Sequence, residues 1–125
     1  MNENEEKLTV HAKMTVKPGK LEELMREMEL WATSSRTESS CEYNEIVQNI
    51  EDPLIITIIE KFTHYEAFKE HMQMPAVRRF IDEVKPRLVD ETYVSFHMTR
   101  IDCIGSKGDP CVEKLSFRSD LMDRP

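Results

Sequence analysis

The sequence predicts a ferredoxin-like α+β domain, an antiparallel four-stranded sheet with the element order β-α-β-β-α-β. Three observations lead to this fold class. Leu8 to Val16 alternates apolar and polar residues, which is the period of a strand. Leu21 to Ala32 places apolar residues three and four apart, which is typical of an amphipathic helix. Ile55 to Ile59 is a run of β-branched residues that suits a packed strand. Strands and helices in this order form the split βαβ arrangement.

The first half of the chain is punctuated by turn signals. Lys17-Pro18-Gly19 ends the first strand, and the polar cluster from Thr33 to Ser40 follows the first helix as a loop. Cys41 to Ile50 is predicted as the second strand. Glu51-Asp52-Pro53 is predicted as a tight turn, from which Leu54 to Phe62 returns antiparallel as the third strand.

The second half contains helices and the last strand. Thr63, with Glu66 three residues later, predicts a capping box at the start of a helix. Pro75 ends that helix and can begin the next one. The next helix carries on one face the apolar residues Val77, Phe80, Ile81 and Val84. Pro86 is expected to limit it, and Thr92 to Ile101 alternates as a fourth strand.

Composition bounds the class of protein. The 125 residues, 39% of them hydrophobic, suffice for one domain with one core. We expect a flexible N-terminal lead over residues 1–6, the domain over 7–101 and a C-terminal extension over 102–125 that either stays loose or packs on a neighbouring subunit. The net charge of −7 argues against nucleic acid as a partner. No apolar run reaches the ~20 residues of a membrane helix.

The start of the chain and the cysteines indicate a compartment. Met1 to Lys7 is acidic and polar, unlike a signal or transit peptide. The cysteines Cys41, Cys103 and Cys111 are odd in number and contain no Cys-x-x-Cys pair, which favours a reducing environment. We therefore expect a cytoplasmic protein.

Several segments resemble the antibiotic biosynthesis monooxygenase domain family, which includes small quinol monooxygenases. The most specific match is Glu60-Lys61-Phe62, followed by the helix segment Ala67 to His71 and the step Met74-Pro75. Shorter matches are Val16 to Lys20, Cys41 to Asn44, and Asp52-Pro53. The resemblance spans Leu8 to Arg100 and implies a dimeric α+β barrel, with a pocket between helices and sheet in each subunit. A homodimer also has a physical reason, because so few helices cover only one face of the sheet.

The resemblance implies a monooxygenase that needs no cofactor. Its substrates would be O2 and a small hydrophobic quinol, aromatic or enolisable carbonyl compound. No His, Cys, Asp and Glu cluster has metal-ligand spacing, so no metal is expected. The alternative is a non-catalytic small-molecule-binding or interaction domain, favoured by hydrocarbon at Ile58 and Phe68, where the oxygenases of this fold carry polar groups. A haem-degrading enzyme is disfavoured because the haem-ligand position aligns with Ile81.

The same segments supply the candidate site. His71 is either a general base or hydrogen-bond donor toward the substrate, or a structural core histidine. Glu60 either orients His71 and takes part in proton transfer, or is paired at the end of the sheet. The expected pocket walls are Phe62, Phe68, Phe96 and Met72. Tyr43 and Asn44 either offer polar groups to a bound ring or form an ordinary strand start.

Overall fold

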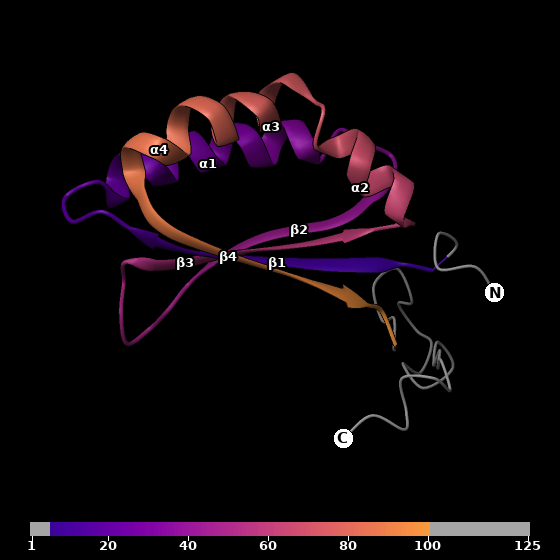
Figure 1. The fold of residues 1–125 in the computed structure, drawn as a ribbon, viewed down its shortest axis with the longest axis horizontal. Coiled ribbons are helices and arrows are strands. Elements are labelled where there is room, and N and C mark those ends of the chain that lie inside the picture. Colours follow the sequence, from indigo (N-terminus) through magenta and orange to yellow (C-terminus); the bar gives the residue numbers. More distant parts are fainter. Residues whose placement is uncertain (1–5, 101–125) are drawn as a thin grey trace.

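A computed structural model describes residues 6–100 as one sheet covered by helices (Figure 1). The sheet has four antiparallel strands in the spatial order β2-β3-β1-β4. Their bounds are Leu8–Val16 for β1, Cys41–Gln48 for β2, Ile55–Phe62 for β3 and Val89–Met98 for β4. This topology confirms the predicted ferredoxin-like α+β fold.

Within residues 6–100, the helices all lie on one face of the sheet, and no described element covers the other face, which we call the bare face (Figure 1). They are α1 (Leu21–Ser35), α2 (Tyr65–His71), α3 (Pro75–Arg79), the π-helical turn η2 (Phe80–Val84) and α4 (Lys85–Leu88). Figure 1 shows α2 and α4 near opposite ends of the sheet, with α3 between them. No helix in residues 6–100 is long and apolar enough to cross a bilayer.

The strand register sets which side chains face the helices. Alternate residues of a strand point to opposite faces, so cross-strand partners form rows on one face. Along the helix-facing side, successive rows are Glu60–Val10–Phe96, Ile58–Ala12–Val94 and Ile56–Met14–Thr92. One end of this face therefore carries a carboxylate, and the other end a hydroxyl.

The core lies between this sheet face and the helices. Leu24 and Met28 of α1 are fully buried against Met14 and Ile56 of the sheet. Burying such a side chain contributes about 1.5–3 kcal/mol relative to leaving it exposed. A second cluster at the α2 end contains Phe62 and Phe68. In the apolar stripe predicted for the first helix, Leu24 and Met28 are buried as expected, whereas Met25 is 37% exposed.

The predicted cap of α2 is wrong by one residue. His64, not Thr63, is the N-cap residue, with an extended backbone at φ −164° and ψ 171°. Its ring Nδ1 accepts a hydrogen bond from the backbone N–H of Ala67 at 2.9 Å. Glu66 does not complete a capping box; its Oε1 instead lies 3.7 Å from Nζ of Lys69. The helix is therefore capped by the imidazole of His64, which accepts from Ala67, and not by the hydroxyl of Thr63 that the sequence predicted.

Pro86 does not end the helical segment, contrary to expectation. The chain widens into the π-helical turn, whose closing bond runs from the Lys85 N–H to the Phe80 carbonyl, and α4 continues to Leu88. Proline lacks an N–H and clashes with the carbonyl four residues earlier, and a wider turn accommodates both effects. β4 follows α4 directly and begins at Val89, earlier than the predicted Thr92.

Two other boundaries shift slightly. α1 extends to Ser35, into the predicted loop, and β2 ends at Gln48 rather than Ile50. The terminal segments over 1–6 and 102–125 fall outside the described residues, apart from Glu6, and so do Cys103 and Cys111. Cys41 is a free, half-buried thiol.

Candidate functional site

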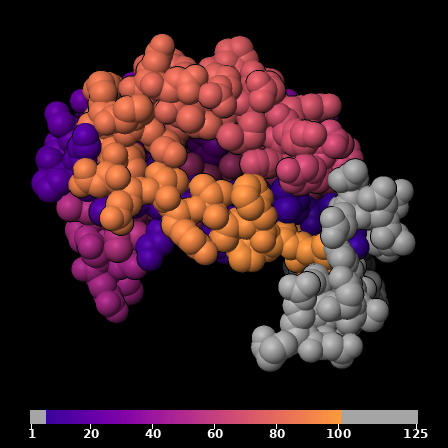
Figure 2. All heavy atoms as spheres, viewed as in Figure 1, coloured from indigo at the N-terminus to yellow at the C-terminus, as the bar shows by residue number. Residues whose placement is uncertain are grey.

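A cavity of about 350 Å³ lies between the helices and the sheet. It corresponds to the hollow between β4 and the helices in Figure 2. Its apolar lining residues are Val10, Ala12, Met14, Trp31, Ile58, Phe68, Met72, Val77, Phe80, Ile81, Val94 and Phe96. Its polar lining residues are Glu60, His71, Lys85 and Thr92. A mostly apolar cavity with a few polar groups is typical of a small-molecule site.

His71 lies between two carboxylates at one end of this cavity. The residue is only 1% exposed. Its Nδ1 is 2.8 Å from Oε2 of Glu38, and its Nε2 is 3.1 Å from Oε2 of Glu60. Ionised carboxylates only accept hydrogen bonds, so a ring that serves both must donate from both nitrogens. The arrangement therefore favours the imidazolium form of His71.

The electrostatics of the pocket agree with this protonation. Burial lowers the pKa of His71, but hydrogen bonds and charges from Glu60 and Glu38 outweigh it and raise the pKa above its usual value. Two aromatic rings also flank the imidazole, Phe62 at 5.0 Å and Trp31 at 5.9 Å between centroids. These rings pack against the imidazole at interplanar angles of 53° for Phe62 and 74° for Trp31.

Glu60 reaches the cavity from β3. It is 7% exposed. Its Oε2 accepts hydrogen bonds from His71 and from Nδ2 of Asn44, the latter at 3.5 Å. Among residues 6–100, none donates a hydrogen bond to its other oxygen, Oε1. Glu60 thus combines a position held by two donors with one oxygen available to a ligand.

Glu38 was not identified from the sequence. It lies in the loop after α1, where its backbone N–H donates to Ser35 and its carbonyl accepts from Cys41. Its carboxylate is largely buried and meets His71 from the side opposite Glu60. Nothing in the polar segment Thr33 to Ser40 distinguishes this glutamate from its neighbours, because the contact spans 33 residues of sequence.

The predicted site residues divide into those that line this cavity and those that do not. His71, Glu60, Phe68, Phe96 and Met72 line it together. Phe62, 1% exposed, packs behind the His71 ring instead of forming a wall. Asn44 acts only through Glu60, and its Oδ1 is buried without a hydrogen-bond partner in the described structure.

Tyr43 was expected in the pocket, and the strand register contradicts this. Tyr43 pairs with Lys61, whereas its neighbour Asn44 pairs with Glu60. Because successive residues point to opposite faces, Tyr43 lies on the bare side of the sheet.

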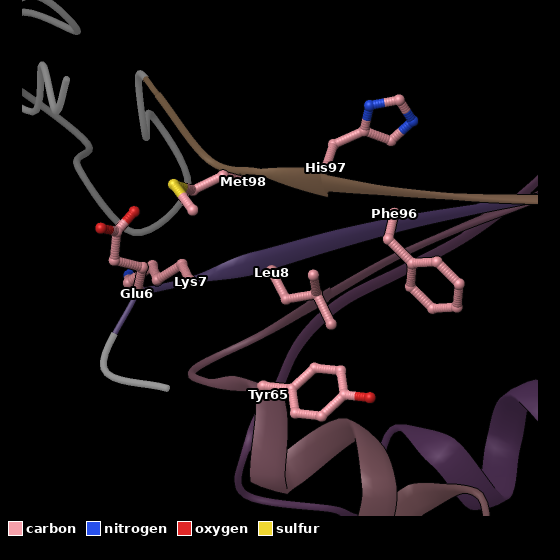
Figure 3. Close-up of a pocket in the computed structure, with 7 residues that line it drawn as sticks. All are labelled: Glu6, Lys7, Leu8, Tyr65, Phe96, His97 and Met98. Carbon is pink, nitrogen blue, oxygen red and sulfur yellow. The ribbon is translucent and has the colours of Figure 1, made fainter. Parts of the chain in front are cut away.

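A second cavity of about 290 Å³ lies where β1 begins and β4 ends. Figure 3 shows Tyr65, Leu8 and Phe96 facing one another across it, while His97 points to the other side of β4. Phe96 lines both cavities. His71 and Glu60 line only the first cavity, which is therefore the candidate site.

The histidine cluster is not arranged as a metal site. Within the part of the chain that the structure describes, no group of three or more His, Cys, Asp and Glu side chains could hold an ion. Glu38 and Glu60 approach opposite nitrogens of one ring, so their oxygens do not converge on a common point.

Fold and site together define a ferredoxin-like α+β protein with an apolar cavity and a buried carboxylate–imidazolium–carboxylate cluster. Residues 7–83 match the family described as antibiotic biosynthesis monooxygenase. The chain belongs to this family, as its resemblance predicted.

Solved structures show the same fold. A Shewanella oneidensis protein is 27% identical, with a TM-score of 0.73 over 77% of this chain and 93% of its own. A Pseudomonas aeruginosa protein is 23% identical, with a TM-score of 0.71 over 78% of this chain and 98% of its own. A candidate antibiotic biosynthesis monooxygenase from Bacteroides thetaiotaomicron is 21% identical, with a TM-score of 0.71 over 78% of this chain and 93% of its own. Among curated proteins, none is significantly similar to this chain.

Proposed function

We propose that this protein is a cofactor-independent monooxygenase that oxidises a small enolisable or phenolic aromatic compound with O2. The observation that carries the proposal is the Glu60 carboxylate at the end of an apolar cavity: His71 holds its Oε2, and no donor in residues 6–100 occupies its Oε1. Membership of the monooxygenase family supports the same chemistry.

The geometry favours a division of roles that reverses the expectation from the sequence. Both ring nitrogens of His71 are occupied by Glu38 and Glu60, so neither is available to a substrate. Glu60, with Oε1 available, is the proton acceptor. His71 is the positioning residue that fixes the Glu60 carboxylate and keeps its charge near a compensating cation. Glu38 holds the imidazole in orientation.

The proposed reaction converts a methylene group that a carbonyl activates, directly or across an aromatic ring, to a second carbonyl; in a phenol this methylene belongs to the keto tautomer. Glu60 removes a proton from the substrate carbon, and the resulting carbanion adds to O2 to form a peroxide. Protonation by Glu60 yields a hydroperoxide, which loses water. For each methylene group, one molecule of O2 is consumed, and one carbonyl group and one molecule of water are formed. The carbon loses four electrons and O2 gains them, so the electron-rich substrate itself is the reductant.

The cavity walls suit this chemistry. Phe68, Phe96 and Ile58 line the site with hydrocarbon, which favours a flat apolar ligand. Phe96 is 55% exposed, so a bound ligand itself would have to displace the water from the cavity. Exclusion of water strengthens the electrostatic effect of each remaining polar group. Once a ligand fills the cavity, displacement of water would also protect a carbanion from protonation by solvent before it meets O2.

The second candidate is a small-molecule-binding domain without catalysis. Its specific support is the apolar character of the wall at Ile58 and Phe68, which leaves no side chain there to stabilise developing charge on oxygen. Binding of aromatic ligands without O2 consumption would favour this function.

Oxygen uptake by the full chain with a panel of quinols and anthrone-type ketones tests the proposal. For a substrate that supports uptake, Glu60→Gln is expected to lower turnover by roughly 10²–10⁴-fold, as is typical for loss of a general base. Glu29→Gln, at an exposed position on α1, is the matched control and is expected to leave turnover unchanged. Wild-type turnover by Glu60→Gln, or no uptake with any compound of the panel, would contradict the proposed function.

A further inference from the structure

Lys85 is a charged residue of the cavity for which the proposed reaction has no role. It begins α4, directly after the π-helical turn, and lines the cavity with a half-buried side chain. Among residues 6–100, no side chain or carbonyl forms a hydrogen bond or ion pair with its ammonium group. Two other basic residues of the same helical segment do form ion pairs. Nη2 of Arg78 lies 2.8 Å from Oδ1 of Asp82, and Nη1 of Arg87 lies 2.7 Å from Oε2 of Glu23.

Lys85 and Glu60 belong to opposite ends of the cavity. Figure 1 places α4, which carries Lys85, and α2, which carries His71, near opposite ends of the sheet. On β4, the cavity extends from Phe96, in the row of Glu60, to Thr92. Four residues of strand span about 13 Å. The cavity is therefore elongated, negative at one end and positive at the other.

An ammonium group in this position lacks compensation. Burial alone lowers the pKa of Lys85, and no neighbouring carboxylate opposes that effect. A partly buried charge without a partner is unfavourable, and an anionic ligand group would relieve the cost. The hydroxyl of Thr92, on the same cavity wall, is suited to donate a second hydrogen bond to such a group.

We propose that the cavity selects elongated aromatic substrates with an anionic group, a carboxylate or an ionised phenol, that binds Lys85 at the end remote from Glu60. The inference rests on the proposed function, because it is Glu60 that defines the reacting end of the substrate. The anion would anchor the molecule so that its oxidisable carbon lies beside the Glu60 carboxylate. Lys85 then determines specificity and takes no part in proton transfer.

Ligand binding can be measured without turnover because the single tryptophan of the chain, Trp31, lines this cavity. The probes are anthraquinone-2-carboxylate and its uncharged carboxamide, titrated against Trp31 fluorescence. The carboxylate is expected to bind wild type about 10-fold or more tightly than the amide, the effect of one charge-assisted hydrogen bond. Equal affinities, or no binding of either probe, would overturn the proposal.

Three variants locate the effect. Lys85→Met keeps the length of the side chain and is expected to remove the preference for the carboxylate while preserving affinity for the amide. Lys85→Arg is expected to retain the preference, and so is Lys20→Met at an exposed lysine outside the cavity. Amide binding shows in each case that the cavity is intact. A carboxylate preference that survives Lys85→Met would exclude Lys85 as the anion site.

Oxygen uptake separates this inference from the proposed function. Selective binding of the carboxylate, without oxygen uptake for any tested compound, would contradict the proposed monooxygenase function but support the anion site at Lys85. Oxygen uptake that depends on Glu60, without any preference for anionic compounds in binding, would support the proposed function but contradict the anion site.

Discussion

His71 is the residue around which the site is organised. Its ring bridges a loop glutamate and a strand glutamate, and these two carboxylates raise its pKa and so favour its positively charged form inside the core. A cation between two carboxylates leaves the cluster with a net negative charge. Of the two carboxylates, Glu60 is the one that lines the cavity, which suits its proposed role as the base.

The raised pKa of His71 predicts how stability depends on pH. Because the folded state binds the proton more tightly than the unfolded chain, this stabilisation is fully present below the unfolded value of about 6.5 and is lost as pH rises through the folded pKa. His71→Gln is therefore expected to destabilise by about 1–3 kcal/mol near pH 6 and by less at pH 9. Urea unfolding of both proteins across this range measures the difference, and a difference that grows with pH would contradict the assignment.

Cys41 lies close to the same acidic cluster. Burial, with contributions from Glu60 and Glu38, raises the pKa of its thiol to about 12. Since the thiolate is the reactive form, alkylation by iodoacetamide at pH 8 is expected to be about a thousandfold slower than for an ordinary cysteine. Mass spectrometry of a Cys103→Ser, Cys111→Ser background isolates this thiol. A rate that levels off near pH 9 would show an ordinary pKa.

The sequence predicted part of this site. His71 and Glu60 could be proposed because a capped helix and a buried strand place them on inward faces. Glu38 could not, because its loop has no periodicity from which an inward face can be deduced. Tyr43 was misplaced because the second strand has no clean alternation, so its register was undetermined until pairing with β3 was known.

At the scale of elements, the N-terminus of α2 depends on an unusual cap. His64 accepts the Ala67 N–H, whereas the Thr63 side chain makes no capping hydrogen bond in the described structure. His64→Ala is expected to cost about 1 kcal/mol, or a few degrees in melting temperature, and Thr63→Ala clearly less. Thermal unfolding of the two variants compares them directly. A larger loss for Thr63→Ala would restore the capping box that the sequence suggested.

The elements that could be predicted best are those with one buried face. The strand Leu8 to Val16 was located correctly because alternation and the Pro18-Gly19 turn agree. The end of the last helix was misplaced because Pro86 is normally a stop signal, while here a π-helical turn lets the helix continue to Leu88. A proline in the sequence does not reveal whether the helix stops or widens around it, so the π-helical turn over Phe80–Val84 could not be predicted.

At the scale of the whole molecule, the main open question is what covers the bare face of the sheet, which no element of residues 6–100 covers. It presents Ile59 from the central strand β3 and Tyr93 from the edge strand β4, the latter 70% exposed. A sheet with helices on only one side is stable in water when its other side is polar or covered. Mixed apolar and charged residues on this face, including Lys13 and Glu45, suit contact with a second copy of the same surface.

We therefore expect a homodimer formed through this face, with an interface on the order of 2,000 Å² or more. Light scattering should give twice the 14.7 kDa mass of the chain at micromolar concentration. Ile59→Asp places a charge at the centre of the face, where a dimer would desolvate it, and is expected to yield folded monomer. Ile50→Asp, at a 98% exposed position in the β2–β3 hairpin, adds the same charge away from the face and is expected to remain dimeric. A monomer mass for wild type, or an unchanged dimer for Ile59→Asp, would show that another surface or no surface covers the sheet.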